Sequence, residues 1–315
     1  MRPQQNIQKK LQNLNHDILN NEKSNLEDIL KELNCLIGLT NVKKLIKELY
    51  AFVIIQKKRG EENLLTESLV LHMVFKGNPG TGKTTVARIL GKLFKEIGIL
   101  NKGHLIEVER ADLVGEYIGQ TAQKTRDQIK KALGGVLFVD EAYSLARGGE
   151  KDFGKEAIDV LVKAMEDYKD NFILILAGYK NEMEWFMKTN PGLTSRLPLQ
   201  IEFPDYTVNE LLSIAQLMMQ RRQYFFNSEA LIKLEKILHK MIASGNNKKG
   251  NARLIRNLIE RSIRLQATRL INQQNITRDD LTLITRDDIS DDILNTLESN
   301  DYYDGFDQSV DYQIS

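Results

Sequence analysis

Short apolar runs alternate with segments of helical periodicity through the middle of the chain. The runs predict strands over residues 69–75, 104–109, 136–140, 172–177 and 199–203. Between them, apolar residues recur at helical spacing and predict helices over residues 83–97, 120–133, 154–168 and 181–188. Strands that alternate with helices predict an α/β fold, in which a parallel sheet carries helices on both of its faces.

The pattern changes after Pro204. Three helical segments are predicted there, over residues 207–222, 228–243 and 251–273, with a break rich in Gly and Asn between the last two. One more helix, over residues 41–59, precedes the first strand. The chain therefore predicts an α/β domain followed by a small all-α C-terminal domain.

Composition is that of a globular protein. The 315 residues are 42% hydrophobic and 28% charged, enough for one or two domains with a real core. No run of about twenty apolar residues is present, so we expect no membrane span. The polar first residues do not resemble a signal peptide, and we expect a cytoplasmic protein.

Charge and metal-binding residue types exclude further classes. Lys and Arg number 44 against 43 Asp and Glu, a net charge of +1, so no overall basic field favours nucleic acid as a partner. The four histidines are far apart and show no zinc-ligand spacing. The single cysteine, Cys35, lies in an apolar stretch, and we expect it to be buried.

The clearest chemical motif is the run Gly77-Asn78-Pro79-Gly80-Thr81-Gly82-Lys83-Thr84, followed by Thr85. It fits the phosphate-binding pattern G-x-x-x-x-G-K-[ST] and lies between a predicted strand and a predicted helix. Glycines let backbone N–H groups converge on phosphates, beside a helix N-terminus. We expect Lys83 at the β- and γ-phosphates of ATP and Thr84 at Mg²⁺. The alternative is a glycine-rich turn that binds no ligand. The predicted strand before the motif and the predicted helix after it favour the phosphate-binding loop.

A second motif ends the third predicted strand. The apolar run 136–139 leads into Asp140 and Glu141, at the carboxyl end of a strand where open α/β sheets bind ligands. Asp140 would hold Mg²⁺, and Glu141 would polarise the water that attacks the γ-phosphate. The alternative is that the two carboxylates simply begin the next loop.

These motifs and their order resemble the AAA+ ATPases. Further segments carry the resemblance to the branch that contains stage V sporulation protein K and the red-type Rubisco activases: Gly119-Gln120-Thr121, the run 134–143, Leu176-Ala177-Gly178-Tyr179, the run 190–196 and the run 201–206. The resemblance runs from about residue 33 to residue 289 and implies a nucleotide-binding domain at 33–204 and a helical lid domain at 205–289. Composition predicts a polar helical or disordered arm at 1–32 and an acidic disordered tail at 290–315. The tail has seven acidic and no basic side chains.

The resemblance also implies roles for single residues. Ile37 and Gly38 match the segment that packs against adenine, with ordinary core packing as the alternative. Arg196 matches the arginine finger that reaches the γ-phosphate of a neighbouring subunit, although such a residue alone would suit a surface ion pair. Arg253 matches the sensor 2 arginine, which contacts the nucleotide. Lys180 occupies the place where many AAA+ proteins have a sensor 1 asparagine, so that role is open.

Tyr117, Ile118 and Gly119 match the aromatic-hydrophobic-glycine pore loop. An aromatic ring can grip a peptide without reading its sequence, and here glycines and polar residues flank it rather than an apolar run. The resemblance thus implies a homo-oligomeric ring, a hexamer, that remodels a protein client in sporulation or, alternatively, Rubisco. Three other classes are a nucleic-acid-acting AAA+ protein, a small-molecule kinase and a nucleotide switch without hydrolysis.

Overall fold

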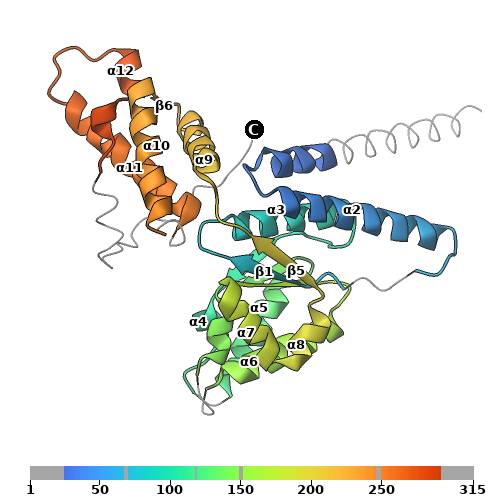
Figure 1. Ribbon diagram of the computed structural model, residues 1–315. Coiled ribbons are helices and arrows are strands. Elements are labelled where there is room, and N and C mark those ends of the chain that lie inside the picture. Colours follow the sequence, from blue (N-terminus) through green and yellow to red (C-terminus); the bar gives the residue numbers. More distant parts are fainter. Residues whose placement is uncertain (1–24, 67–69, 118, 149–151, 246–249, 292–315) are drawn as a thin grey trace, which may run out of the picture. The chain divides into compact units, whose positions relative to one another are not determined.

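The computed structural model describes residues 25–66, 70–117, 119–148, 152–245 and 250–291. The chain separates into two compact units, and the division falls after Tyr206. The first unit contains a parallel sheet, and the second consists mainly of helices (Figure 1). The predicted fold class is confirmed.

The first unit is built on a five-stranded sheet in the order β2-β3-β4-β1-β5. Its strands are β1 (Met73–Gly77), β2 (Leu105–Val108), β3 (Val136–Val139), β4 (Ile173–Gly178) and β5 (Leu199–Phe203). Every neighbouring pair is parallel. The two central strands β3 and β4 are buried along their whole length, which explains their continuous apolar sequence.

Helices pack on both faces of this sheet. One core cluster joins Val74, Leu137 and Leu174 of three strands to apolar residues of α5 (Gln120–Ala132), α6 (Gly154–Asp167) and α7 (Lys180–Thr189). On the opposite face, the rings of Phe75, Phe138 and Phe203 lie together, and α3 (Lys83–Glu96) packs against Val136. Alternate strand residues therefore fill two separate cores.

Three short helical segments of the first unit were missing from the predicted elements. They are α4 (Arg110–Leu113), η1 (Ala142–Ala146) and α8 (Pro191–Arg196). Each has six residues or fewer, too short for a helical repeat to show in the sequence. Pro191 begins α8, a first position where the missing N–H costs nothing.

Two helices precede the sheet. A helix over residues 25–35 buries Leu33, which is 1% exposed, and is followed by α2 (Thr40–Glu61). The helix at 25–35 lies partly within the segment predicted as a polar helical or disordered arm, of which residues 1–24 lie outside the described part. Cys35 is exposed, so the prediction that it is buried was wrong. Leu33 takes the inward position, and Cys35 points elsewhere because it is two residues further round the helix.

The second unit contains α9 (Val208–Arg221), α10 (Ser228–Ala243), α11 (Asn251–Leu270) and the short α12 (Arg278–Thr282). Leucines and isoleucines at helical spacing on α9, α10 and α11 form its core. A small parallel pair, β6 (Phe225–Phe226) and β7 (Leu283–Ile284), and the turn η3 (Arg286–Asp288) complete it. Two-residue strands carry no repeat and were not predicted. Residues 292–315 of the predicted tail lie outside the described part.

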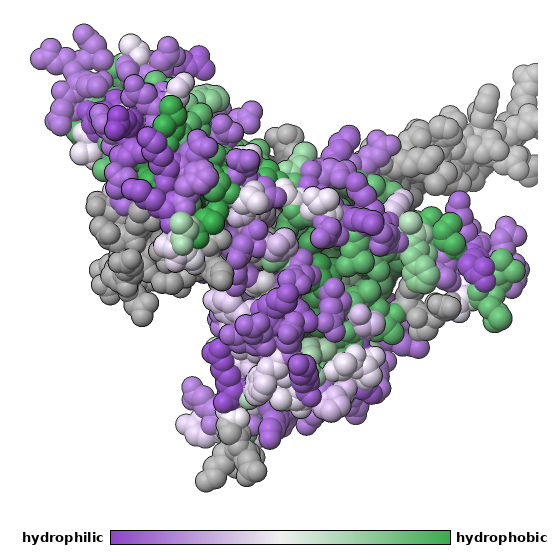
Figure 2. Space-filling model, in the orientation of Figure 1, coloured by the Kyte–Doolittle hydropathy of each residue, from purple (hydrophilic) through white to green (hydrophobic). Residues whose placement is uncertain are grey.

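The surface is mostly hydrophilic on the face shown in Figure 2. Large apolar side chains that remain exposed include Phe52 and Ile55 of α2 and Leu65 just beyond it. Among the described residues, no helix is long and apolar enough to cross a membrane. The same residues contain no group of three or more His, Cys, Asp or Glu side chains placed to hold a metal ion.

Candidate functional site

The glycine-rich loop connects β1 to α3. Gly77 has a φ of +159°, and a Cβ there would come within 2.4 Å of the Phe203 carbonyl oxygen. Gly80 and Gly82 also have positive φ values, 71° and 97°. Because such angles favour glycine, the backbone can curl into a concave loop whose last residue is the N-cap of α3. This is the strand-to-helix setting that the sequence predicted.

Lys83 is folded back onto its own loop. Its Nζ donates hydrogen bonds to the carbonyl oxygens of Gly77 at 2.8 Å and Asn78 at 2.9 Å. Burial lowers the pKa of Lys83, while the carboxylates of Asp140, Glu141 and Asp205 act in the opposite direction. The side chain is thus held against its own loop by two hydrogen bonds, near three carboxylates that favour its charged form.

Asp140 and Glu141 follow β3 directly. Glu141 is exposed and has a φ of 46°, a left-handed conformation that is costly for a residue with a side chain. Its N–H donates to Oδ1 of Asp140 at 2.9 Å. The backbone therefore turns between the two residues, and both carboxylates lie close enough to Lys83 to favour its charged form.

Glu107 on β2 belongs to the same group, and sequence reasoning missed it. The Thr84 hydroxyl lies 3.4 Å from Oε1 of Glu107. Shielding from water and the nearby Asp140 raise the pKa of Glu107. The sequence did offer one signal for it, because Glu107 is a charged residue within the strand predicted over residues 104–109. Thr84, Asp140 and Glu107 offer only oxygen atoms, the ligands that Mg²⁺ prefers.

Two further residues contact the loop from the end of β5. Asn78 donates its side-chain amide to both carboxylate oxygens of Asp205, at 2.9 and 3.0 Å. The Tyr206 hydroxyl donates to the Thr81 carbonyl oxygen at 3.1 Å. Neither residue had been singled out, although both lie in the run 201–206 that carries the family resemblance. Parallel strands bring them here because the carboxyl ends of β1 and β5 are adjacent.

The segment predicted to contact adenine adjoins the same loop. Ile37 and Gly38 are half-buried, and the next residue, Leu39, is buried with a φ of 54°. A Cβ at Gly82 would lie 3.5 Å from the Leu39 side chain and 3.4 Å from the Tyr206 hydroxyl. An apolar wall thus stands beside the loop. Its role towards adenine stays a prediction.

Arg196 lies at the end of α8 and contacts its own subunit. Its Nε donates to Oε1 of Glu166 on α6 at 3.0 Å, and its Nη1 donates to the Gly192 carbonyl oxygen at 3.0 Å. Lys180, at the open sensor 1 position, pairs with Glu202 at 2.6 Å. The surface ion pair considered for Arg196 therefore exists, and it leaves the finger role as a prediction.

The other two predicted sites lie away from this loop in the chain. Arg253 belongs to the second unit, in the first turn of α11, where its backbone N–H donates to the Gly250 carbonyl oxygen at 2.7 Å.

Tyr117, of the predicted pore loop, lies between α4 and α5 and is 68% exposed. Gly119 has a φ of 84°, and no atom beyond its own chain neighbours lies within 4 Å of where its Cβ would be. Ile118 lies outside the described residues.

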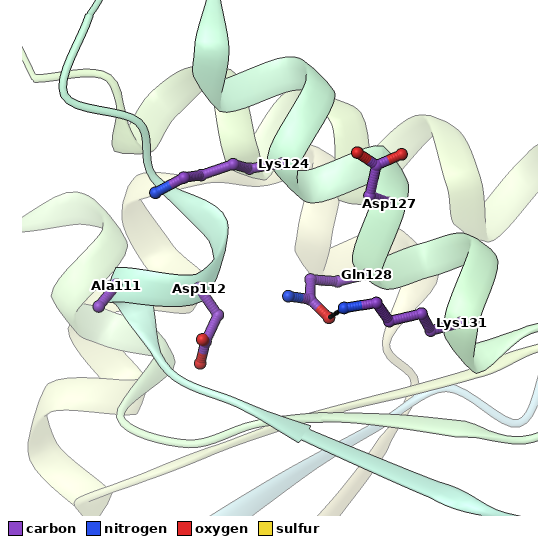
Figure 3. A pocket seen from close by; sticks show the side chains of 6 residues that line it. All are labelled: Ala111, Asp112, Lys124, Asp127, Gln128 and Lys131. Atoms are coloured by element: carbon purple, nitrogen blue, oxygen red, sulfur yellow. Dashed lines mark hydrogen bonds between the residues drawn. The ribbon is translucent and has the colours of Figure 1, made fainter.

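A separate depression between α4 and α5 is lined by the six side chains labelled in Figure 3, with a volume of about 310 Å³. Its charged groups already have protein partners. Lys124 donates to the Val114 carbonyl oxygen at 3.2 Å, and Asp112 accepts from the Glu109 N–H at 2.9 Å. Figure 3 also shows Lys131 donating a hydrogen bond to the side-chain oxygen of Gln128. Because its charged groups are already paired within the protein, this depression is a weaker candidate for a nucleotide site than the glycine-rich loop.

Comparison with known proteins identifies the family. A model described as "ATPase family associated with various cellular activities (AAA)" matches residues 73–205, and an "AAA lid domain" model matches residues 207–299. Stage V sporulation protein K of Bacillus subtilis is 57% identical over 266 residues, 84% of this chain and 83% of that protein. A CfxQ homologue of Galdieria sulphuraria is 44% identical over 290 residues, 89% and 94% of the two chains. Protein CbxX of Cupriavidus necator, plasmid-encoded, is 43% identical over 264 residues, 83% of each.

Solved structures agree on the fold. The AAA domain of FIGL-1, in complex with ADP, matches with a TM-score of 0.55 at 18% identity, over 81% of this chain and 80% of that one. A RuvB mutant of Thermotoga maritima matches with a TM-score of 0.52 at 22% identity, over 83% and 69%. The chain belongs to the AAA+ ATPases, as a relative of stage V sporulation protein K and of the CbxX and CfxQ proteins.

Proposed function

We propose that this ATPase forms a ring and remodels a protein client at the central pore of that ring. The observation that carries the proposal is Tyr117, a large aromatic side chain that is 68% exposed on a connection with glycine on both sides. Exposed aromatic rings without a structural partner suit contact with another chain. A ring of such residues would grip a polypeptide regardless of its sequence.

Hydrolysis is assigned to the residues around the glycine-rich loop. Gly77 to Thr85 would cradle the phosphates, with Lys83 at the β- and γ-phosphates and Ile37 and Gly38 beside the adenine. Thr84 and Asp140 would hold Mg²⁺, which neutralises developing phosphate charge. Glu141 would orient and deprotonate the attacking water.

Assembly into a ring, a hexamer in our proposal, follows from Arg196. Its side chain contacts Glu166 of its own subunit rather than the acidic group around Lys83. A guanidinium that serves the γ-phosphate from a neighbouring subunit makes each site depend on the next. Arg253, as sensor 2, would contact the nucleotide of its own subunit. A place in the cytoplasm stays a prediction.

The client stays open between two possibilities. The identity of 57% to stage V sporulation protein K favours a sporulation-related client over a Rubisco-like one, at 43% identity to CbxX. A nucleic-acid substrate is the rival class, and the net charge of +1 argues against it.

A test of the pore assignment replaces Tyr117. We expect Tyr117→Ala to keep nucleotide affinity and ring size, because this side chain lies outside the nucleotide loop, and to lose stimulation of ATP hydrolysis by unfolded casein. Tyr117→Phe should keep that stimulation, because the ring face is retained. Tyr168→Ala, which removes another exposed tyrosine, serves as the control.

Equal casein stimulation of wild type and Tyr117→Ala would exclude the pore role. Stimulation by single-stranded DNA in place of casein would favour the nucleic-acid class.

A further inference from the structure

A second depression lies on the surface of the helical unit, along α10. We call it the α10 groove; its volume is about 570 Å³, and it is lined by residues of α10, by Arg286 of η3 and by Asp291. Ile237, which is 2% exposed, and Ile232, which is 53% exposed, give it an apolar part. All of these residues belong to the second unit, so the groove is formed within that unit alone.

The α10 groove carries more positive than negative charge. Its basic side chains are Lys233, Lys236, Lys240 and Arg286, and its carboxylates are Glu229 and Asp291. The three lysines are spaced by three and four residues, which places them on one side of the helix. Lys236, Lys240 and Arg286 are exposed, and none of the three has an ion-pair partner in the part of the chain that the structure describes. The groove therefore suits an acidic chain.

The described part of the chain ends beside this groove. Lys233 Nζ donates to the Ile289 carbonyl oxygen at 2.5 Å and lies 3.4 Å from Oδ2 of Asp291. Asp291 is the last residue before the acidic end of the sequence. The residues that follow it thus start next to the three lysines.

The last sixteen residues of the sequence have the complementary charge. The match to the AAA lid domain ends at residue 299, so residues 300–315, which we call the 300–315 segment, lie beyond it. The segment has no Lys or Arg, and it contains four aromatic residues. Its carboxylates are spaced by three and four residues, like the lysines of α10: Asp301, Asp304, Asp307 and Asp311.

The connection is long enough for the two to meet. Nine residues separate Asp291 from Asp301, and an extended chain of that length reaches about 30 Å. Lys233 and Lys240 are seven residues apart on a helix, a distance of about 10 Å. Each exposed ion pair is weak alone, but a short tether gives an effective concentration on the order of millimolar, so several weak pairs suffice for docking.

We propose that the 300–315 segment docks in the α10 groove of its own subunit, with its aspartates at Lys236, Lys240 and Arg286 and its aromatic rings against Ile232. A docked segment closes the groove to other acidic chains. The docking involves neither the glycine-rich loop nor Tyr117, so it holds or fails independently of the proposed remodelling function.

The experiment cross-links the full chain with a carbodiimide, which joins a lysine amine to a carboxylate only when the two are in contact. The sample is an equal mixture of unlabelled and ¹⁵N-labelled protein, with subunit exchange checked by native mass. At low salt, Lys236 and Lys240 should link to the aspartates of the 300–315 segment, in peptide pairs of a single isotope. At about 1 M NaCl most of these links should disappear, because salt screens exposed charges.

A variant that keeps both reactive amines tests the groove itself. Arg286→Glu reverses one charge of the groove and should remove most links from Lys236 and Lys240 to the segment. Arg278→Glu, at an exposed arginine of α12 outside the groove, is the matched control and should keep them.

A charge exchange provides the rescue. Lys236→Glu combined with Lys240→Glu should also abolish the links that Lys233 makes to the segment. Adding Asp304→Lys and Asp307→Lys should restore cross-linking between the segment and α10.

Three results would overturn the proposal. One is an absence of links to the segment at low salt, or links no more frequent than those of Lys188, an exposed lysine of α7. Another is links found mainly in mixed-isotope pairs, which would assign the groove to a second copy of the chain. The last is an equal yield of links in Arg286→Glu and Arg278→Glu.

Discussion

At the scale of single residues, Lys83 and Glu141 illustrate two different uses of charge around one loop. Lys83 is half-buried and donates hydrogen bonds to backbone carbonyl oxygens, which phosphate oxygens would replace in the proposed function. Glu141 is exposed and holds a left-handed backbone conformation, φ 46°, of the kind that clusters at functional sites. In the proposed function, the first would interact with bound nucleotide and the second with the attacking water.

Replacing these two residues should separate binding from hydrolysis. Lys83→Ala should weaken ATP binding by about 10- to 100-fold or more, the value of a charge-assisted hydrogen bond. Glu141→Gln should bind ATP nearly normally and hydrolyse it about 100-fold or more slowly. Fluorescent-nucleotide titration and steady-state ATPase rates measure both effects. Equal ATP affinity of wild type and Lys83→Ala would contradict the assignment.

Glu166 controls the freedom of Arg196. Its carboxylate is 59% exposed, so the ion pair should contribute less than about 1 kcal/mol to stability. Glu166→Gln should therefore leave thermal stability unchanged and raise the ATPase rate of the assembled ring by up to about fivefold, because the arginine is released towards the neighbouring site. Asp159→Asn, also on α6, is the control. A lower rate in Glu166→Gln would show that the ion pair orients the arginine instead.

At the scale of elements, a buried ion pair ties η3 to α11. Asp288 is 1% exposed and accepts two hydrogen bonds from Arg269, both at 2.9 Å. Thr285 adds bonds from its N–H at 2.8 Å and its hydroxyl at 2.9 Å. Burial alone would raise the pKa of Asp288, but the bonds from Arg269 and Thr285 outweigh it and hold that pKa below its usual range.

Breaking this pair should destabilise the second unit. Arg269→Met leaves a carboxylate buried without its partner and should cost about 3 kcal/mol, whereas adding Asp288→Leu should recover part of the loss. Arg222→Met removes only an exposed pair with Glu260 and is the control. Exchange rates of α11 amides report the local stability. A loss no greater than that of the control would contradict the structural role.

The pH dependence of the second unit has a definite sign. The folded state keeps Asp288 ionised to a lower pH than the unfolded chain does, because its pKa is depressed from 3.8. The stabilisation is complete above the unfolded value and is lost as pH falls below it, since the unfolded chain then binds the additional proton.

At the scale of the whole molecule, the proposed ring makes each active site a shared property of two subunits. Arg196→Ala alone should bind ATP and barely hydrolyse it. Mixed with Lys83→Ala, it should regain part of the activity, because an intact Arg196 in one subunit then serves an intact glycine-rich loop in the next. ATPase rates across mixing ratios, with mixed assembly checked by mass, measure this. No rescue in rings shown to be mixed would exclude the trans role.

Much of the first unit could be predicted from local pattern. The alternation of apolar runs and helical repeats indicated its five strands and the long helices between them, because burial on two faces requires continuous apolar strands. The second unit was predicted as helical for the same reason. Helical segments of six residues or fewer, such as α8, and the two-residue strands β6 and β7 were missed, since they are too short to show a helical or strand repeat.

The sequence by itself identified the glycine-rich loop, because Gly77, Gly82, Lys83 and Thr84 lie close together in the chain at the spacing of a phosphate-binding pattern. Tertiary structure decided which distant residues meet that loop. The strand order places β1 between β4 and β5, and so brings Asp205 to Asn78. The tertiary structure also determines that Cys35 is exposed and that Arg196 pairs with Glu166. Local periodicity encodes which face of an element is buried, whereas the partner across that face depends on packing of the whole chain.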